Sequence, residues 1–597
     1  MDRMKKDLRG LLFKKFAPRI SSSACSLVVL LIIEGYILFN FVIPFVRYNN
    51  LYIWDMVGHY YLADYYKTTL WPRWTGWNPY FFGGFPIGKF YPTFFHWIVG
   101  GLGKIFGTFL AFKLVTVIAL FLTPISFLYF LRKLGFEDEA SAFSLVFMFI
   151  ALFYMGNFQW PGGDYTATFN FGLIPQHFSL SILFFYLGSL VDLFKKNKII
   201  LPTIFLSLLI LTHAYSAIVG FLGFLGILSA NFMIITLKGQ KARENGKISS
   251  ITKIVILALK HLFLTFLLIS FWAIPFILEK DYTSLTIIGW ETVPIPPITY
   301  NLLLISVVLM VITEDDRALT SLMIGLWVLL PFLLSKWNVF FLPVQLYRFV
   351  VYPVLFISAP LGVIISFVKK NYDRIEKFLA RIIRIKLKKI QFSKFFVIIF
   401  FIVFTFATLF HFSSYCKADP RGTLGMNFTL PKLDGRILTI PIHGVGLNPM
   451  FHIAPHLVAW SGNEEVGGLF LESTPNAGYI THIKREIDER VGIWGVYPAT
   501  VTPNKNELLP YHFKYFGINY VLTNLDPEYF RAIFGESIVM KLVDTNSIYG
   551  SYYLIKVANN SLIDVLDYIP EKIEGNWHEI QWEWFFDSNK IKKIFTN

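Results

Sequence analysis

The chain is poor in charged residues and in cysteine. Charged residues make up 16% of its 597 residues, whereas soluble globular proteins carry about 25%, so a single ordinary soluble domain is excluded. Intrinsic disorder is excluded as well, because 55% of the residues are hydrophobic. The two cysteines, Cys25 and Cys416, lie near opposite ends of the hydrophobic region, so we expect no structural disulfide. Aromatic residues are abundant instead, with 63 Phe, 30 Tyr and 15 Trp, which suits a protein partly surrounded by lipid.

Long apolar runs occupy the first two thirds of the chain. A helix needs about 20 residues to cross ~30 Å of hydrocarbon. We interpret eleven runs as membrane spans: 24–46, 108–131, 140–156, 172–194, 199–212, 215–237, 252–278, 298–313, 319–335, 347–368 and 395–413. The first run is too long for a cleaved signal peptide. The sequence therefore predicts an integral α-helical membrane bundle of about eleven helices over residues 1–413.

Basic residues divide the connecting segments into two groups. Six segments together hold 28 Lys and Arg, and the positive-inside rule predicts that they are cytoplasmic: 1–20, 132–139, 195–198, 238–253, 313–318 and 369–394. Three other segments together hold only eight Lys and Arg and are predicted to lie outside: 47–107, 279–297 and 335–348. A further span at 90–107 would invert this arrangement, so we expect that segment to lie on the outer surface or to re-enter the membrane. The N-terminus is then cytoplasmic, in a multi-pass protein of the cell membrane.

The last third of the chain has a different composition. Residues 414–597 hold 16 Lys and Arg against 20 Asp and Glu, whereas residues 1–413 hold 38 against 19. The basic excess thus belongs to the membrane part, and we expect no nucleic-acid partner. Strand-like runs occur at 436–441, 518–522 and 552–557. The sequence predicts an extracellular, water-soluble α/β domain over 414–597.

The first outer loop, 47–107, has unusual chemistry. If 55–68 is a helix, Asp55 and His59 lie four residues apart and share a face. Turn-forming residues follow in Leu70-Trp-Pro-Arg-Trp74, Gly83-Gly-Phe-Pro86 and Lys89-Phe-Tyr-Pro92. The glycine and proline residues of these motifs favour tight turns, so they predict a folded loop rather than a solvated one.

This loop resembles that of the GT-C superfamily, the polytopic membrane glycosyltransferases that take a sugar from a polyprenyl-phosphate carrier. The similar features are an Asp after the first span, an amphipathic helix, and then P-x-W, G-x-P and Y-P. Looser matches lie elsewhere in the chain: Leu211-Thr-His-Ala-Tyr215, Phe271-Trp-Ala-Ile-Pro275, Leu346-Tyr-Arg-Phe349 and Tyr515-Phe-Gly-Ile-Asn-Tyr-Val521. Together they resemble a mostly archaeal branch of large membrane proteins whose label refers to 6-pyruvoyl-tetrahydropterin synthase, although the chain shows no His-rich pterin-type metal site. A GT-C enzyme often has an acidic pair at its first site, whereas Met56 follows Asp55 here.

Glycosyl transfer from a lipid phosphate needs a carboxylate to take the proton of the acceptor hydroxyl. Asp55 is the candidate base, and the resemblance implies the same role; the alternative is a helix N-cap. His59 could share a proton with Asp55, or the two could bind a divalent metal such as Mg or Mn, as some GT-C enzymes do. The alternative for His59 is an interfacial histidine with an ordinary hydrogen bond.

The reaction also needs cations for the departing phosphate. Arg348 is the best candidate, because a guanidinium binds phosphate oxygens in a bidentate manner; its alternative role is snorkelling at the membrane interface. Lys336, His213 and Arg73 are further candidates for the donor phosphate. Residues that could contact the sugar or the acceptor, or only anchor the chain at the interface, are Lys89, Asp164, Trp160, His177, Glu279, Glu291 and Trp290.

The sequence therefore predicts a membrane glycosyltransferase that uses a polyprenyl-phosphate sugar of the dolichyl type, with inversion at the sugar. The acceptor would be a hydroxyl of a glycan, lipid or protein on the outer face. Two other classes stay open: a lipid or glycan transporter or flippase, and a non-catalytic scaffold whose outer domain binds glycans. Transporters tend to contain paired broken helices in related repeats, and we find no such pairing in this sequence.

Overall fold

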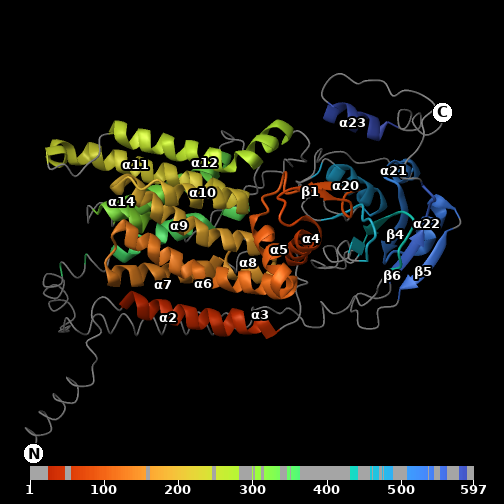
Figure 1. Ribbon diagram of the computed structural model, residues 1–597, viewed down its shortest axis with the longest axis horizontal. Helices are drawn as coiled ribbons and strands as arrows, with labels where there is room; N and C mark the ends of the chain where they lie inside the picture. The colour runs from red at the N-terminus through yellow and green to blue at the C-terminus, as the bar shows by residue number, and fades with distance from the viewer. Residues whose placement is uncertain are drawn as a thin grey trace, which may run out of the picture.

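The computed structural model describes residues 25–47, 55–155, 162–244, 251–280, 299, 303–308, 310, 315–336, 346–349, 351–363, 367, 371, 430–440, 458–459, 461–468, 474, 476–488, 507–535, 537–542, 552–560 and 577–587. They form a long helical bundle with an α/β unit at one end (Figure 1). The bundle comprises α2 (Cys25–Ile37), η2 (Leu38–Val42), α3 (Ile43–Arg47), α6 (Thr108–Leu134), α7 (Asp138–Met155), α9 (Ile174–Lys196), α10 (Ile200–Thr212), α11 (Ala214–Glu244), α12 (Ile251–Glu279), α14 (Asp316–Lys336) and α15 (Val351–Ser358).

Five described helices are long and apolar enough to cross a membrane: Cys25–Arg47, Thr108–Leu134, Ile174–Lys196, Ala214–Thr236 and Ile251–Glu279. Each coincides with a span predicted from the sequence, and the chain is a membrane protein on this basis. The predicted span 199–212 becomes α10, whose 13 residues reach only about 20 Å, which is less than the hydrocarbon thickness. The predicted span 395–413 and half of 298–313 lie outside the described residues.

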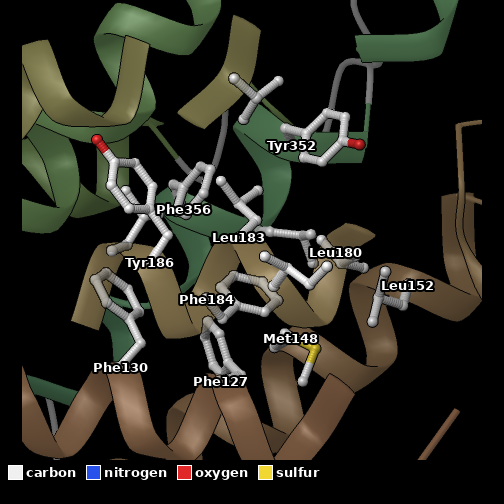
Figure 2. Close-up of a cluster of buried hydrophobic side chains, with 14 of the residues drawn as sticks. Phe127, Phe130, Met148, Leu152, Leu180, Leu183, Phe184, Tyr186, Tyr352 and Phe356 are labelled. Carbon is white, nitrogen blue, oxygen red and sulfur yellow. The ribbon is translucent and has the colours of Figure 1, made fainter. Parts of the chain in front are cut away.

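The core of the bundle forms where α6, α7, α9 and α15 meet. Figure 2 shows Phe127 and Phe130 of α6 against Phe184 of α9, with Phe356 of α15 above them. The rings of Phe127 and Phe184 meet edge to face, with centroids 4.9 Å apart, an arrangement that aromatic quadrupoles favour. Tyr352 lies at the edge of this cluster, so the packing of α15 also fixes the polar residues near its first turn.

Charged side chains gather at the end of the bundle away from the α/β unit. Arg132 and Ser26 both bind Asp138, Lys133 and Lys196 pair with Asp192, and Arg317 Nη1 donates to the Gly135 carbonyl oxygen at 3.0 Å. The structure thus brings together three segments predicted to be cytoplasmic, 132–139, 195–198 and 313–318. The 27-residue helix α6, about 40 Å long, separates them from the other end.

The first loop is folded at the opposite end of the bundle. It contains α4 (Asp55–Tyr65), η3 (Tyr66–Leu70), β1 (Gly76–Asn78), β2 (Phe85–Ile87) and α5 (Phe94–Phe106). The strands β1 and β2 pair antiparallel, and Tyr66, which is fully buried, binds Trp74 O and Thr93 Oγ1 through its hydroxyl. The 13-residue α5 is shorter than a span and packs on α4 and α6.

The α/β unit, defined here as the described residues 430–587, contains a four-stranded sheet. The strands are β3 (Arg436–Ile440), β4 (Ile518–Thr523), β5 (Ile538–Leu542) and β6 (Tyr552–Lys556), in the order β3-β4-β6-β5. Strands β3 and β4 are parallel, and the other pairs are antiparallel. Four helices accompany the sheet: α20 (Asn476–Ile487), α21 (Leu509–Tyr515), α22 (Pro527–Phe534) and α23 (Trp577–Phe586). The predicted boundary at 413/414 lies outside the described residues.

The α/β unit contacts the first loop directly. Phe82 N donates to Gly467 O at 3.2 Å, and Glu465 N donates to Tyr80 O at 2.9 Å. Val57 of α4 packs in one buried apolar cluster with residues of β3, β4 and β6. Backbone hydrogen bonds and apolar burial therefore hold the unit at the end of the bundle where α4 begins (Figure 1).

Candidate functional site

Asp55 and Arg348, the two residues selected from separate sequence motifs, form an ion pair. The Arg348 Nη2 atom lies 3.8 Å from Asp55 Oδ2, and the side chains are 17% and 32% exposed. The separation is longer than a direct hydrogen bond, so a ligand oxygen could bind the guanidinium without large movements. The pair lies at the same end of the bundle as the first loop.

The start of α4 is fixed by the connection between two other helices. The chain links α8 (Tyr165–Asn170) to α9 through Gly172, and Asp55 N donates to Phe171 O at 3.2 Å. Gly172 has φ +75°, and a Cβ atom there would lie 2.1 Å from Met56 N. Only glycine allows both this conformation and this close approach, so Gly172 helps to set the position of Asp55.

Arg348 is held by its own backbone and by its neighbours. It lies in the turn η5 (Leu346–Phe349), immediately before α15. The adjacent Phe349 is buried and meets the ring of Tyr215 edge to face, with centroids 5.4 Å apart. Gln176 Nε2 donates to the Arg348 carbonyl oxygen at 3.1 Å. The guanidinium therefore extends from a fixed backbone rather than from a free loop end.

His213 lies in the break between α10 and α11, with an extended backbone at φ −159° and ψ 120°. Its Nδ1 atom is 3.2 Å from Ser216 Oγ. Burial, and secondarily the charge of Arg348, lower the pKa of His213 to about 3. The imidazole is thus neutral at physiological pH and can supply a hydrogen bond near Arg348, but no positive charge.

A ring of hydrogen bonds joins three helices beside Arg348. Gln176 Nε2 lies 3.4 Å from the Tyr352 hydroxyl, which lies 2.8 Å from Ser216 Oγ. Ser216 Oγ contacts Ser179 Oγ at 2.5 Å, and Ser179 Oγ donates to the Gln176 carbonyl oxygen at 2.6 Å. Sequence analysis did not identify Gln176, Ser179, Ser216 or Tyr352, because no local pattern distinguishes them from other polar residues near helix ends.

His59 is buried and pairs with another histidine. Its Nδ1 atom lies 3.0 Å from His96 Nε2 of α5, and both residues are almost fully buried. Sequence analysis missed His96, although a single imidazole in the apolar stretch 94–106 was a usable signal. Within the part of the chain that the structure describes, no group of three or more His, Cys, Asp or Glu could hold a metal ion. The divalent metal considered from the sequence for Asp55 and His59 stays a prediction.

Two candidates from outer segments form a second ion pair. Lys89 of the first loop pairs with Glu279 at the end of α12, and the neighbouring Phe90 and Phe276 rings pack edge to face. This contact fastens the first loop to α12. Arg73 is exposed, and its Nη2 atom donates to Thr69 O at 3.4 Å; no contact places it with Arg348.

Asp164 and His177 are buried and have structural partners. Asp164 caps α8, accepting a hydrogen bond from Ala167 N at 2.8 Å. His177 Nδ1 is 3.0 Å from Gly163 O, and its Nε2 is 3.3 Å from Thr123 Oγ1. Both ring nitrogens of His177 are therefore within hydrogen-bonding distance of protein atoms, so we do not include it in the site proposed below.

The remaining candidates cannot be placed from described side chains. Trp160, Trp290 and Glu291 lie outside the described residues, and Lys336 is described only as the last residue of α14. Their proposed contacts with phosphate, sugar or acceptor stay predictions.

Comparisons with known proteins give low similarity over most of the chain. No family model matches the sequence, and no curated protein matches it. Among solved structures, the Archaeoglobus fulgidus oligosaccharyltransferase in its apo form matches with a TM-score of 0.47 and 11% identity, over 92% of this chain and 76% of that one. The archaeal oligosaccharyltransferase AglB from the same organism, in complex with an inhibitory peptide and a dolichol-phosphate, matches with a TM-score of 0.39 and 12% identity, over 93% of this chain and 75% of that one. Both TM-scores are below 0.5.

Proposed function

We propose that the chain is a membrane glycosyltransferase that moves a sugar from a polyprenyl-phosphate carrier of the dolichyl type to a hydroxyl of an acceptor. The observation that carries the proposal is the Asp55–Arg348 pair. A carboxylate and a guanidinium at one site are the two charged groups that this reaction requires. Both belong to a chain with at least five helices able to cross a membrane, in which a lipid-linked substrate can diffuse to the site.

In the proposed reaction Asp55, Arg348 and His213 each have a separate role. The acceptor oxygen forms a bond to the anomeric carbon of the sugar, and the bond from that carbon to the phosphate oxygen breaks. Asp55 takes the proton of the acceptor hydroxyl, and Arg348 binds the phosphate, whose negative charge increases as it leaves. The neutral His213 supplies a further hydrogen bond to the phosphate. A single carboxylate is sufficient for inversion, because no covalent sugar–enzyme intermediate forms.

We place this site on the outer face of the cell membrane. Three basic segments predicted to be cytoplasmic meet at one end of the bundle, and the Asp55–Arg348 pair lies at the other end. The positive-inside rule favours this orientation. Nucleotide sugars are made in the cytoplasm, so a site on the outer face is expected to use a lipid-linked donor.

The test is a transfer assay with the full-length chain in lipid nanodiscs, supplied with dolichyl-phosphate mannose or glucose. Asp55→Asn should lower turnover by about 10²–10⁴, which is the usual contribution of a positioned base. Asp64→Asn is the matched control, because Asp64 lies on the same helix but binds Thr108 instead, and it should keep most of the activity. Near-normal transfer by Asp55→Asn would remove its role as base, and transfer from a nucleotide sugar alone would overturn the proposed function.

A further inference from the structure

The amide of Gln176 has one acceptor atom for which the described residues supply no donor. The residue is 1% exposed, and its Oε1 atom is buried without a hydrogen-bond partner among the described residues. A buried amide oxygen left without a partner destabilises the folded protein. Such a position is expected to be filled by a water molecule or by a donor group of a ligand.

The orientation of the amide is fixed by its other contacts. The carbonyl oxygen of Arg348 can only accept, so the atom 3.1 Å from it must be the Nε2 donor. Gly163 also restricts the side chain, because a Cβ atom at Gly163 would lie 2.7 Å from Gln176 Cγ. Exchanging the oxygen and nitrogen would place two acceptors against each other, so Oε1 is the atom left open.

The ring beside Arg348 uses its donors internally. Ser179 gives its hydroxyl hydrogen to the Gln176 carbonyl oxygen, so Ser216 donates to Ser179. Ser216 then accepts from Tyr352, and Tyr352 accepts the second Nε2 hydrogen of Gln176. With this assignment no hydroxyl of the ring remains for Oε1.

We propose that Gln176 Oε1 accepts a hydrogen bond from a hydroxyl group of the sugar that is transferred. This inference rests on the proposed function. The sugar is bonded directly to the phosphate, and the Gln176 amide contacts the backbone of Arg348, the residue proposed to bind that phosphate. Gln176 is therefore a specificity-determining residue that distinguishes a glycosylated polyprenyl phosphate from the bare carrier.

The test measures the binding of two probes, dolichyl phosphate and dolichyl-phosphate mannose, to the full-length chain by native mass spectrometry. The wild type should bind the mannosylated probe more tightly than dolichyl phosphate. In Gln176→Met the ratio of these two affinities should fall about five- to tenfold, the value of one hydrogen bond. Tyr352→Phe breaks the ring but leaves Oε1, so it should retain the difference. This control separates a direct contact with the sugar from the loss of the ring's hydrogen bonds. A loosening of Arg348 would instead weaken the binding of both probes, because both carry the phosphate.

The outcomes separate the two proposals. If the wild type binds both probes equally, or if Gln176→Met keeps the full difference, Oε1 holds only a water molecule and the inference is wrong, while the proposed function stands. If Tyr352→Phe loses the difference as fully as Gln176→Met, the inference is also wrong, because the effect then comes from the ring. If the wild type binds neither probe, the proposed function fails and the inference fails with it.

Discussion

Arg436 at the start of β3 donates from Nη2 to the carbonyl oxygen of Gly83 at 3.3 Å, and so ties the α/β unit to the first loop. Asn476 adds a second tie from α20, because its Nδ2 atom donates to Phe82 O at 3.1 Å. The unit therefore lies against the same loop that contains Asp55. We expect it to support that loop mechanically.

Asn476→Ala tests this support. Loss of the hydrogen bond to Phe82 should weaken docking by about 1 kcal/mol, which is about a fivefold increase in hydrogen exchange over residues 80–87. Arg531→Ala is the control, because it removes only the exposed pair with Glu528. Equal exchange in both variants would show that the α/β unit does not stabilise the first loop.

Gly172→Ala tests the placement of Asp55. The substitution adds a strained φ and a contact 2.1 Å from Met56 N, so it should displace the start of α4 and lower transfer. Gly135→Ala is the matched control: it has φ +99°, but its nearest contact is 3.8 Å away, at the opposite end of the bundle. Both variants carry the backbone strain of about 1–2 kcal/mol, seen as a lower melting temperature. Equal transfer rates would contradict the positioning role of Gly172.

The α/β unit should become less stable as pH rises, because of Glu486. This carboxyl group lies 2.9 Å from His512 Nδ1, while His512 Nε2 lies 3.0 Å from Phe585 O. Burial raises the pKa of Glu486 above its usual value near 4.5. The folded state therefore binds a proton that the unfolded state has lost, and the free energy of unfolding falls as pH rises from about 4.5 through the raised pKa.

Hydrogen exchange of α21 and α23 as a function of pH measures this effect. Glu486→Gln removes the titrating group but keeps a side-chain N–H that can bind Nδ1 of His512. Its exchange profile should be flatter across the same pH range. A profile as steep as that of the wild type would assign the pH dependence to other groups.

The orientation of the bundle can be tested by cysteine labelling. In a background without Cys25 and Cys416, Lys198→Cys should react only from the cytoplasmic side and Glu528→Cys only from outside. Both side chains are exposed at opposite ends of the structure. Labelling of Lys198→Cys from outside in intact cells would reverse the proposed topology and place the site in the cytoplasm.

Local patterns in the sequence were sufficient for the five long apolar helices and for three of the four strands of the sheet in the α/β unit. They did not predict β1 and β2 of the first loop or the helices of the α/β unit. The runs at 436–441, 518–522 and 552–557 correspond to β3, β4 and β6. Strand β5 was missed although it is as long as β3 and β6. It lies at the sheet edge, and its exposed positions hold the apolar residues Ile538 and Met540, so its sequence shows no alternation of apolar and polar residues. The apolar run 199–212 matches α10 to within one residue, so the bounds of this helix were predictable, although it is shorter than a membrane span.

The arrangement of the site could be predicted only in part. Asp55 and Arg348 were each identifiable from a local motif, but their pairing depends on packing between segments far apart in the chain. Gln176 was missed for the same reason, because its partners Arg348 and Tyr352 belong to a distant segment, whereas His96 could have been noticed as a single imidazole in an apolar stretch. Single-sequence reasoning can identify a charged residue in an apolar region, whereas the hydrogen bonds that orient it become visible only after folding.

Binding of dolichyl phosphate, without sugar, to the wild type and to variants of the central pair tests the account most directly. Arg348→Ala should weaken binding at least about tenfold, because a charge-assisted hydrogen bond contributes about 1.5–3 kcal/mol. Arg348→Lys should restore part of the affinity, since a point charge does not replace a guanidinium fork. Asp55→Asn should bind dolichyl phosphate as tightly as the wild type or more tightly, because the Asp55 carboxylate no longer competes with the phosphate for Arg348. Unchanged affinity in Arg348→Ala would contradict the assignment of the phosphate to this pair.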